Sequence, residues 1–315
     1  MALVFTTNTY AGEGASEYIS QALLGASTLD RDLVTILPNV KKRQVIRLIE
    51  QDVVIQAEKC NFNPLGNTTF NERYLDPVGM QVNYELCIKD LRTSWEAAKL
   101  RAGRNNETIP DDLGTFLIEE TIRKIKIAVD KLFWNGKAAG ATTVGSSEVT
   151  FEAALVYSGL LTELAADAAV IDVDLEAITA ANVVTELSKI YEAILESVRY
   201  SDELVMLVSP NVASAYRLAQ ATVSTGQGAY FTGSRDINFL GMNMEIVNHL
   251  PANTVLVYRR SNVYFGTDLL SDFNEVRTVD MRNTTADKKV RFSADFAFDG
   301  NYAYGGEIVY GRVIA

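Results

Sequence analysis

The sequence is poor in the residues that most often carry catalysis and metal binding. It has one histidine, His249, and two cysteines, Cys60 and Cys87, among 315 residues. A serine–histidine–aspartate arrangement would therefore depend on His249 alone, and a metal site that needs two histidines is excluded. No CxxC pair or Cys/His cluster with the spacing of zinc ligands occurs.

The two cysteines are too few for a disulfide framework. We expect two reduced thiols, as in a chain made in a reducing cytosol. The alternative is a cross-strand bridge near the base of one extended hairpin.

Basic residues are also in deficit, with 29 Lys and Arg against 40 Asp and Glu, which gives a formal net charge of −11. Proteins whose main task is to grip phosphate backbones depend on clustered Lys and Arg. The runs at 41–43 and 288–289 are too short to reverse the balance, and they are interpreted as solvated surface charge. Sequence-specific nucleic-acid binding is therefore not expected.

Long apolar runs are absent as well. The N-terminal stretch has no basic start followed by an apolar segment, so it is not interpreted as a signal peptide. No run approaches the ~18 apolar residues that span a bilayer. We expect no membrane partner and synthesis in the cytoplasm.

Little else in the sequence suggests a catalytic or metal-binding site. His249 stands just before a Pro turn, where an ordinary turn histidine is the simpler interpretation. Asp172, Asp174 and Glu176 have part of the spacing of a calcium loop but lack its Gly and terminal Glu. We therefore assign no catalytic, cofactor-binding or metal-ligating residue, and we expect no enzyme activity and no cofactor.

The clearest element that is present is a long amphipathic helix from Asp111 to Gly136. Its apolar residues recur at steps of three and four along one face, namely Ile118, Ile122, Ile125, Val129 and Leu132. Opposite charges four apart, including Lys126 with Asp130, are expected on the outer face. A helix roughly 37 Å long with one apolar stripe indicates a strut with a sheet along one side.

A long hairpin is predicted before this helix. Residues 45–57 are apolar and β-branched, and residues 80–91 mirror them, so we expect these two strands to pair. The stretch between them is rich in Asn, Pro and Gly, and loops of that length are usually functional or disordered. Its Phe70, Arg73 and Tyr74 are candidate contact residues for a partner surface. The alternative is that they fold back on their own domain.

The rest of the chain divides into an arm, an α/β lobe and a β-rich end. Residues 1–40 have too little apolar content to order alone, apart from a short helix expected at 15–24. The lobe is predicted to hold helices at 180–198 and 212–220 and strands at 204–208, 244–247, 254–258 and 263–266. Alternate residues from Val290 to Phe298 are apolar, which predicts a half-buried strand, and residues 302–310 are expected to close its sheet. This C-terminal sheet is the expected partner of the long helix.

Three stretches, taken in order, resemble a known family. They are LFWNGKAAG at 132–140, LVMLVSPNVASAYRLA at 204–219, and the Pro turn and N-x-Y-F-G strand within 246–280. The first resembles a spine helix that stops at an Asn-Gly or Asp-Gly step, the second a strand–"NP"–helix unit, and the third a return between two domains. Together they resemble the tailed-phage major capsid family with the HK97-type fold, over essentially the whole chain.

The resemblance implies an α+β, HK97-like fold in five parts. These are an N-terminal arm at 1–40, a strand and extended loop (E-loop) at 41–92, a peripheral domain at 93–146 with a spine helix at 111–135, an axial domain at 147–273, and C-terminal strands of the peripheral domain at 274–315.

By the same resemblance, the chain is expected to be a structural protein that self-assembles as pentamers and hexamers. The icosahedral shell would enclose packaged double-stranded DNA, so the protein would reside in the virion capsid after assembly in the host cytoplasm. A portal is an expected partner. Because the arm begins almost at Met1, we also expect a separate scaffolding protein and no maturation cleavage of this chain. The acidic balance suits a shell wall that repels DNA.

Three alternatives remain at this point. An encapsulin-like compartment has the same fold but encloses cargo enzymes. A soluble α/β enzyme with a site near His249 belongs to a different class. Another virion component, such as a tail or decoration protein, should lack the spine helix.

Overall fold

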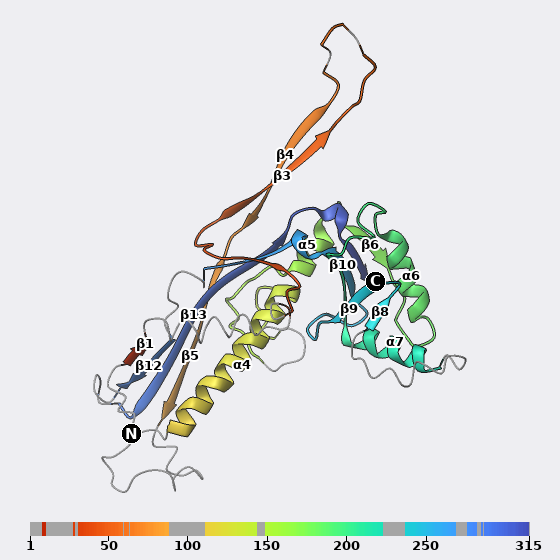
Figure 1. Ribbon diagram of the computed structural model, residues 1–315. Coiled ribbons are helices and arrows are strands. Elements are labelled where there is room, and N and C mark those ends of the chain that lie inside the picture. The colour runs from red at the N-terminus through yellow and green to blue at the C-terminus, as the bar shows by residue number, and fades with distance from the viewer. Residues whose placement is uncertain are drawn as a thin grey trace.

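A long β platform, an α/β lobe and a projecting hairpin make up the computed structural model of the chain (Figure 1). The structure describes residues 8–10, 28, 31–58, 60–62, 64–87, 111–143, 149–222, 237–268, 276–281, 285 and 287–314. The described helices are α4 (Asp111–Asn135), α5 (Leu160–Ala166), α6 (Val183–Ala193) and α7 (Pro210–Thr222). The helix expected at 15–24 lies outside the described residues.

The platform is a sheet built around the 14-residue strand β13. Its strands are β1 (Asn8–Tyr10), β2 (Thr35–Leu37), β5 (Val78–Cys87), β11 (Val263–Thr267), β12 (Val276–Asp280) and β13 (Lys289–Tyr302). Strand β5 pairs along one edge of β13, while β12 and β11 pair with successive parts of the other edge. Every second residue of β13 from Val290 to Tyr302 is buried, which confirms the predicted alternation.

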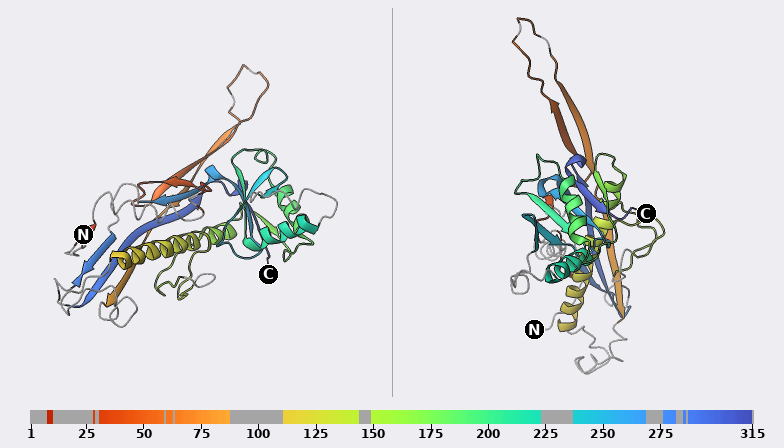
Figure 2. Two further views of the ribbon diagram at one scale, coloured as in Figure 1. Left: turned by 60° about the horizontal axis from the view of Figure 1, so that its bottom comes forward. Right: turned by 90° about the vertical axis from the view of Figure 1, so that its right-hand side faces the viewer.

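Helix α4 lies along this sheet, as Figure 2 shows most clearly in its left view. The predicted helix bounds are confirmed, and Ile125, Val129 and Leu132 of its apolar face are buried in one core with residues of β11 and β13. Near the C-terminal end of the helix, the ring of Phe133 lies 5.6 Å from that of Phe265. The expected pairing of the helix with the C-terminal sheet is therefore confirmed.

One expectation for α4 is wrong. Asp130, placed on the outer face by its spacing from Lys126, has only 2% of its surface exposed, and the neighbouring Lys131 has 3%. The reason is that the last turns of the helix are enclosed on more than one side, since Thr28 and the turn at His249 both reach Asp130. Burial on several sides is a tertiary effect that the stripe of apolar residues does not encode.

The lobe is a second sheet in the order β6-β14-β10-β7-β9-β8. Its strands are β6 (Ile171–Asp174), β7 (Leu204–Val208), β8 (Ile237–Phe239), β9 (Met242–Ile246), β10 (Val255–Arg259) and β14 (Val309–Arg312). Strand β7 is buried at every residue, as its unbroken apolar sequence predicts. Helices α6 and α7 share a hydrophobic core with this sheet.

The expectation that the end of the chain closes the platform sheet is wrong. Instead, a 3-10 turn (η4) at Gly305–Glu307 carries the chain across, and Val309 pairs with Val257 of the lobe. The chain therefore runs directly from the central strand of the platform into the lobe, which couples the two.

The pairing expected for the hairpin is also wrong. Strand β3 (Gln44–Asp52) pairs with β4 (Asn67–Leu75), whereas β5, the strand expected to pair with β3, pairs with β13. Strand β4 has few large apolar residues and is largely exposed, so its sequence resembles a loop. Asp76 and Pro77 separate it from β5. From here on, the hairpin means residues 44–75.

Candidate functional site

The hairpin is the most unusual surface of the molecule, because it projects well away from the platform and lobe in each view (Figures 1 and 2). Half of the exposed large hydrophobic residues in the described chain lie on it, namely Val45, Ile49, Val53, Val54, Ile55, Phe62, Leu65, Phe70 and Tyr74. Ile55 and Phe62, near the tip, are each 95% exposed. Clustered exposed apolar groups usually mark an interaction surface.

The base of the hairpin, by contrast, is firmly packed. Leu75, the last residue of β4, is fully buried, as is Val40 just before the hairpin. The side chain of Leu75 fills the space that Gly266 leaves open, since a Cβ at Gly266 would lie 3.2 Å from Cδ1 of Leu75. The hairpin is therefore an arm with an apolar anchor at its root.

Arg73 adds a polar anchor at the same place. Its guanidinium forms an ion pair with Asp167, its Nε donates to the carbonyl of Ala303 at 3.0 Å, and it lies 4.0 Å over the ring of Tyr302. The Tyr302 hydroxyl also donates to Asp167, at 2.7 Å. Burial alone would raise the pKa of Asp167, but the hydrogen bonds from the Ala169 N–H, Tyr302 and Arg73 hold it below its ordinary value.

The three residues singled out in the sequence have different surroundings. Arg73 folds back on its own chain, whereas the side chain of Phe70 is 71% exposed. Tyr74 is exposed on one side and donates its hydroxyl to Glu72 at 3.0 Å, while Arg43 covers its ring at 4.1 Å. Contact between any of them and another copy stays a prediction.

Sequence reasoning missed Asp299, which also holds the base. Its carboxylate accepts the backbone N–H of Asp76 at 2.6 Å, directly after the hairpin. Burial raises the pKa of Asp299 to about 6. In the sequence, Asp299 is an acidic residue before Gly300 at a position that alternates with the apolar residues of the strand. Such a residue is expected to be an ordinary surface residue.

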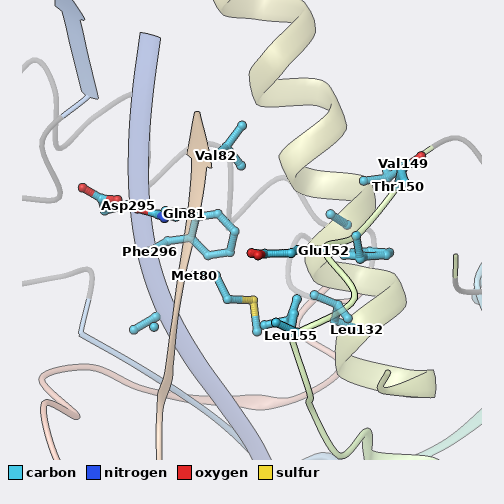
Figure 3. A pocket seen from close by; sticks show the side chains of 15 residues that line it. Met80, Gln81, Val82, Leu132, Val149, Thr150, Glu152, Leu155, Asp295 and Phe296 are labelled. Atoms are coloured by element: carbon cyan, nitrogen blue, oxygen red, sulfur yellow. The ribbon is translucent and has the colours of Figure 1, made fainter. Parts of the chain in front are cut away.

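One cavity is lined mainly by apolar side chains and brings together no catalytic set of residues. It has a volume of about 650 Å³ and lies between β5, β13, α4 and residues 149–155, with Met80, Val82, Leu132, Leu155 and Phe296 among its walls. Figure 3 shows Glu152 and Asp295 on opposite sides of it. The residues that line it include no histidine, cysteine or lysine.

His249 lies in a structural cluster. Its Nε2 is 4.0 Å from Oδ2 of Asp130, and the Thr28 hydroxyl donates to the other oxygen of that carboxylate. The Trp134 indole donates to Thr28 at 2.8 Å, and the Asn135 side chain donates to the His249 carbonyl at 2.7 Å. The Thr28 hydroxyl is thus engaged on both sides, since it donates to Asp130 and accepts from Trp134. The arrangement ties the end of α4 to the lobe, and among the described residues that these bonds join, the one hydroxyl, that of Thr28, is already used.

Cys60 and Cys87 are both free thiols. In the part of the chain that the structure describes, no group of three or more His, Cys, Asp and Glu residues could hold a metal ion. Among those same residues, no helix is long and apolar enough to cross a membrane.

Comparison with known proteins gives a likeness of fold without a likeness of sequence. No protein-family model and no curated protein matches the sequence. Among solved structures, a chain of the satellite phage P4 procapsid with its size determination protein matches with a TM-score of 0.56 and 13% identity, over 94% of this chain and 99% of that one.

Two further structures give the same result. A chain from the capsid of an empty GTA particle matches with a TM-score of 0.58 and 12% identity, over 92% of this chain and 90% of that one. A chain of a virus-like particle from Pyrococcus furiosus matches with a TM-score of 0.53 and 8% identity, over 95% of this chain and 98% of that one. The fold is therefore that of phage capsid proteins, and the resemblance drawn from the sequence is confirmed at the level of the fold.

Proposed function

We propose that this chain is a major capsid protein that assembles with copies of itself, as pentamers and hexamers, into a closed icosahedral shell around double-stranded DNA. The observation that carries the proposal is the match along nearly the full length of both chains to proteins of a phage procapsid and a GTA capsid. A fold shared over a whole chain, with no catalytic set in the described residues, favours a structural role over an enzymatic one.

In this proposal the hairpin is the extended loop of the HK97-type fold and α4 is its spine helix. The 25 residues of α4 and its burial against β13 suit a strut. The parts proposed from the sequence are the arm at 1–40, the E-loop region at 41–92, the peripheral domain at 93–146 and 274–315, and the axial domain at 147–273. Two strands depart from these bounds, because β11 pairs in the platform sheet and β14 in the lobe sheet.

The hairpin is proposed to lie on a neighbouring copy. A single copy gains nothing from exposing Ile55 and Phe62 almost completely, because each fully buried side chain of this kind is worth about 1.5–3 kcal/mol. Repeated copies that interlock would bury these groups. Phe70 and Tyr74, also exposed, are proposed to join the contact, while Arg73 fixes the base from which the arm extends.

The remaining proposed partners follow from the proposed role as a capsid protein. A separate scaffolding protein and a portal would take part in assembly in the host cytoplasm, and the product would be the virion capsid. The DNA would be enclosed without sequence-specific contacts, and the net charge of −11 suits a wall that does not hold it.

A second candidate is a shell that encloses protein cargo rather than DNA. The likeness to a chain of a virus-like particle favours it enough to be tested alongside the first.

Light scattering and negative-stain electron microscopy test both candidates, on the protein alone and co-expressed with the products of neighbouring genes. We expect closed shells, or pentamers and hexamers that close into shells. DNA protected from nuclease inside those shells supports the capsid, and protein cargo without DNA supports the second candidate. A protein that stays monomeric or dimeric under all these conditions would contradict both.

A further inference from the structure

The pairing of β3 with β4 sorts the side chains of the hairpin onto two faces. Residues that lie opposite each other in an antiparallel pair point to the same face, and successive residues along a strand alternate. Ile49 lies opposite Phe70, and Val45 lies opposite Tyr74. The face that these pairs define, here called the aromatic face, carries Val45, Arg47, Ile49, Gln51, Thr68, Phe70, Glu72 and Tyr74. The other face of the outer hairpin, here called the polar face, carries Glu50, Asp52, Asn67, Thr69 and Asn71.

At its base, the hairpin turns the aromatic face away from its own body. Leu48 and Leu75, which lie on the same side as the polar face, are buried there, and Arg73 forms its ion pair on that side. The hydroxyl of Tyr304 donates to the backbone carbonyl of Ile49 at 3.2 Å, yet Ile49 remains 57% exposed. Contacts within one copy therefore hold the hairpin from one side only.

Beyond the base, the two faces differ in composition although the strands project away from the platform and lobe (Figure 1). Every residue of the polar face is exposed, and none has a large apolar side chain. On the aromatic face, Phe70 is 71% exposed beside Ile49. A two-stranded hairpin is at best marginally stable in water unless one face packs against another element. A partner that covers the aromatic face alone accounts for this difference.

The two faces also differ in charge. Arg43 lies over the ring of Tyr74 and so joins Arg47 on the aromatic face, where Glu72 is the one acidic residue. The polar face carries two acidic residues and no basic one. A second copy of this chain has a net charge of −11, so it attracts the aromatic face and repels the polar face. Two arginines with a glutamate between them are too few to grip a phosphate backbone.

We propose that the hairpin contacts a second copy of the chain through its aromatic face, while its polar face stays in water. The inference rests on the proposed function and deepens it, because it specifies which side of the hairpin the neighbouring copy covers. Phe70 and Tyr74 are then buried together in the contact. Arg73, which points to the other side, keeps its contacts within its own copy.

Light scattering over a range of protein concentrations, under conditions in which the wild type forms shells, tests which face is covered. Phe70→Gln and Thr69→Gln place the same neutral side chain at neighbouring exposed positions of β4, one on each face. We expect Phe70→Gln to raise the concentration needed for assembly by about tenfold, because each copy loses one buried aromatic contact. Thr69→Gln should leave that concentration within about twofold of the wild-type value, as for a substitution in water.

A second pair repeats the comparison on β3. Ile49→Gln and Glu50→Gln again place one glutamine on each face, and we expect only Ile49→Gln to impair assembly. The four original side chains are exposed in a single copy, so all four variants should unfold in denaturant like the wild type before assembly. Agreement between the two pairs therefore assigns a loss of assembly to the contact and not to misfolding.

The outcomes separate this inference from the proposed function. Wild-type protein that never forms shells would overturn the proposed function and, with it, this inference. Wild-type shells together with equal losses on both faces, or a loss on the polar face alone, would overturn the inference and leave the function standing. So would normal assembly of Phe70→Gln and Ile49→Gln. If Phe70→Gln forms shells normally but no longer retains a co-expressed protein, that protein and not a second copy covers the aromatic face.

Discussion

Gly136 and Gly159 lie with their backbones in direct contact. A Cβ built on Gly136 would stand 2.2 Å from the nitrogen of Gly159, and one built on Gly159 would stand 2.0 Å from the nitrogen of Gly136. Gly136 also has a φ of +65° and ends α4, while Gly159 precedes α5. Next to this crossing, Lys137 and Tyr157 exchange backbone hydrogen bonds at 2.6 and 3.1 Å. The crossing fixes how the long helix leads into the segment before the lobe.

Gly159→Ala should therefore destabilise the protein strongly, by about 2–4 kcal/mol, since neither backbone can retreat from the added methyl group. Denaturant unfolding measures the loss. Gly140→Ala is the matched control: Gly140 has a φ of +78° but no atom within 4 Å of its Cβ position, so its cost should be only the ~1–2 kcal/mol of left-handed strain. Equal losses at Gly140 and Gly159 would show that the close approach is not the cause.

Gly136 and Gly159 illustrate which parts of the fold the sequence reveals. Gly136 was predicted as a helix stop because it directly follows a periodic segment, and the same kind of local pattern predicted α4, β7 and β13. Gly159 follows no such pattern, because the need for glycine comes from a segment that crosses it from elsewhere in the chain. Non-local contacts of this kind are invisible to periodicity.

The same limit explains the other errors and omissions. The partners of β5 and β14 lie far along the chain, so β5 was wrongly paired with β3, and β14 was given the wrong sheet. At the candidate site, the aromatic and basic residues of a turn-rich loop directed attention to Arg73. Its partner Asp167 gave no signal, because an acidic residue at the end of a short helix is ordinary until the fold brings the arginine to it.

Phe133 and Gly300 form a second tight contact, between α4 and β13. A Cβ on Gly300 would lie 2.4 Å from Cε2 of Phe133, whose ring is held against Trp134 and Phe265. Gly300→Ala should cost about 1–3 kcal/mol through overpacking. In a Phe133→Leu background the ring is gone and the added methyl group has room, so the cost should fall by about 1 kcal/mol or more in a double-mutant cycle. Strictly additive losses would mean that the ring does not limit this position.

Arg73→Gln tests the polar anchor of the hairpin. It removes the ion pair with Asp167 and the stacking on Tyr302, and bonds of this charged kind are worth about 1.5–3 kcal/mol. We expect a loss of that size in denaturant unfolding and faster proteolysis at the hairpin base. Arg47→Gln, an exposed position on the same hairpin, should change neither. If both variants behave alike, Arg73 is not an anchor.

The contribution of this anchor should depend on pH in a defined direction. The pKa of Asp167 lies below its ordinary value of 3.8, so the stabilisation is fully present above about pH 4–5 and is lost as pH falls through the lowered pKa. The difference in unfolding free energy between wild type and Arg73→Gln should therefore be constant from pH 8 to pH 5 and shrink toward pH 3. A difference that grows on acidification would contradict the assigned contacts of Asp167.

The exposed tip of the hairpin gives the most direct test of assembly. Phe62 is 95% exposed in a single copy, so Phe62→Asp should leave the unfolding free energy of the unassembled protein within about 0.5 kcal/mol of wild type. If the tip is buried against a neighbouring copy, the same change places a charge in an apolar contact and should block shell formation in light scattering. The neighbouring Asn61→Asp adds the same charge at an exposed polar residue and should reduce assembly far less. Phe62→Asp protein that forms shells as readily as the wild type would show that the tip does not hold copies together. Equal failure of both variants would assign the effect to charge at the tip rather than to the lost apolar contact.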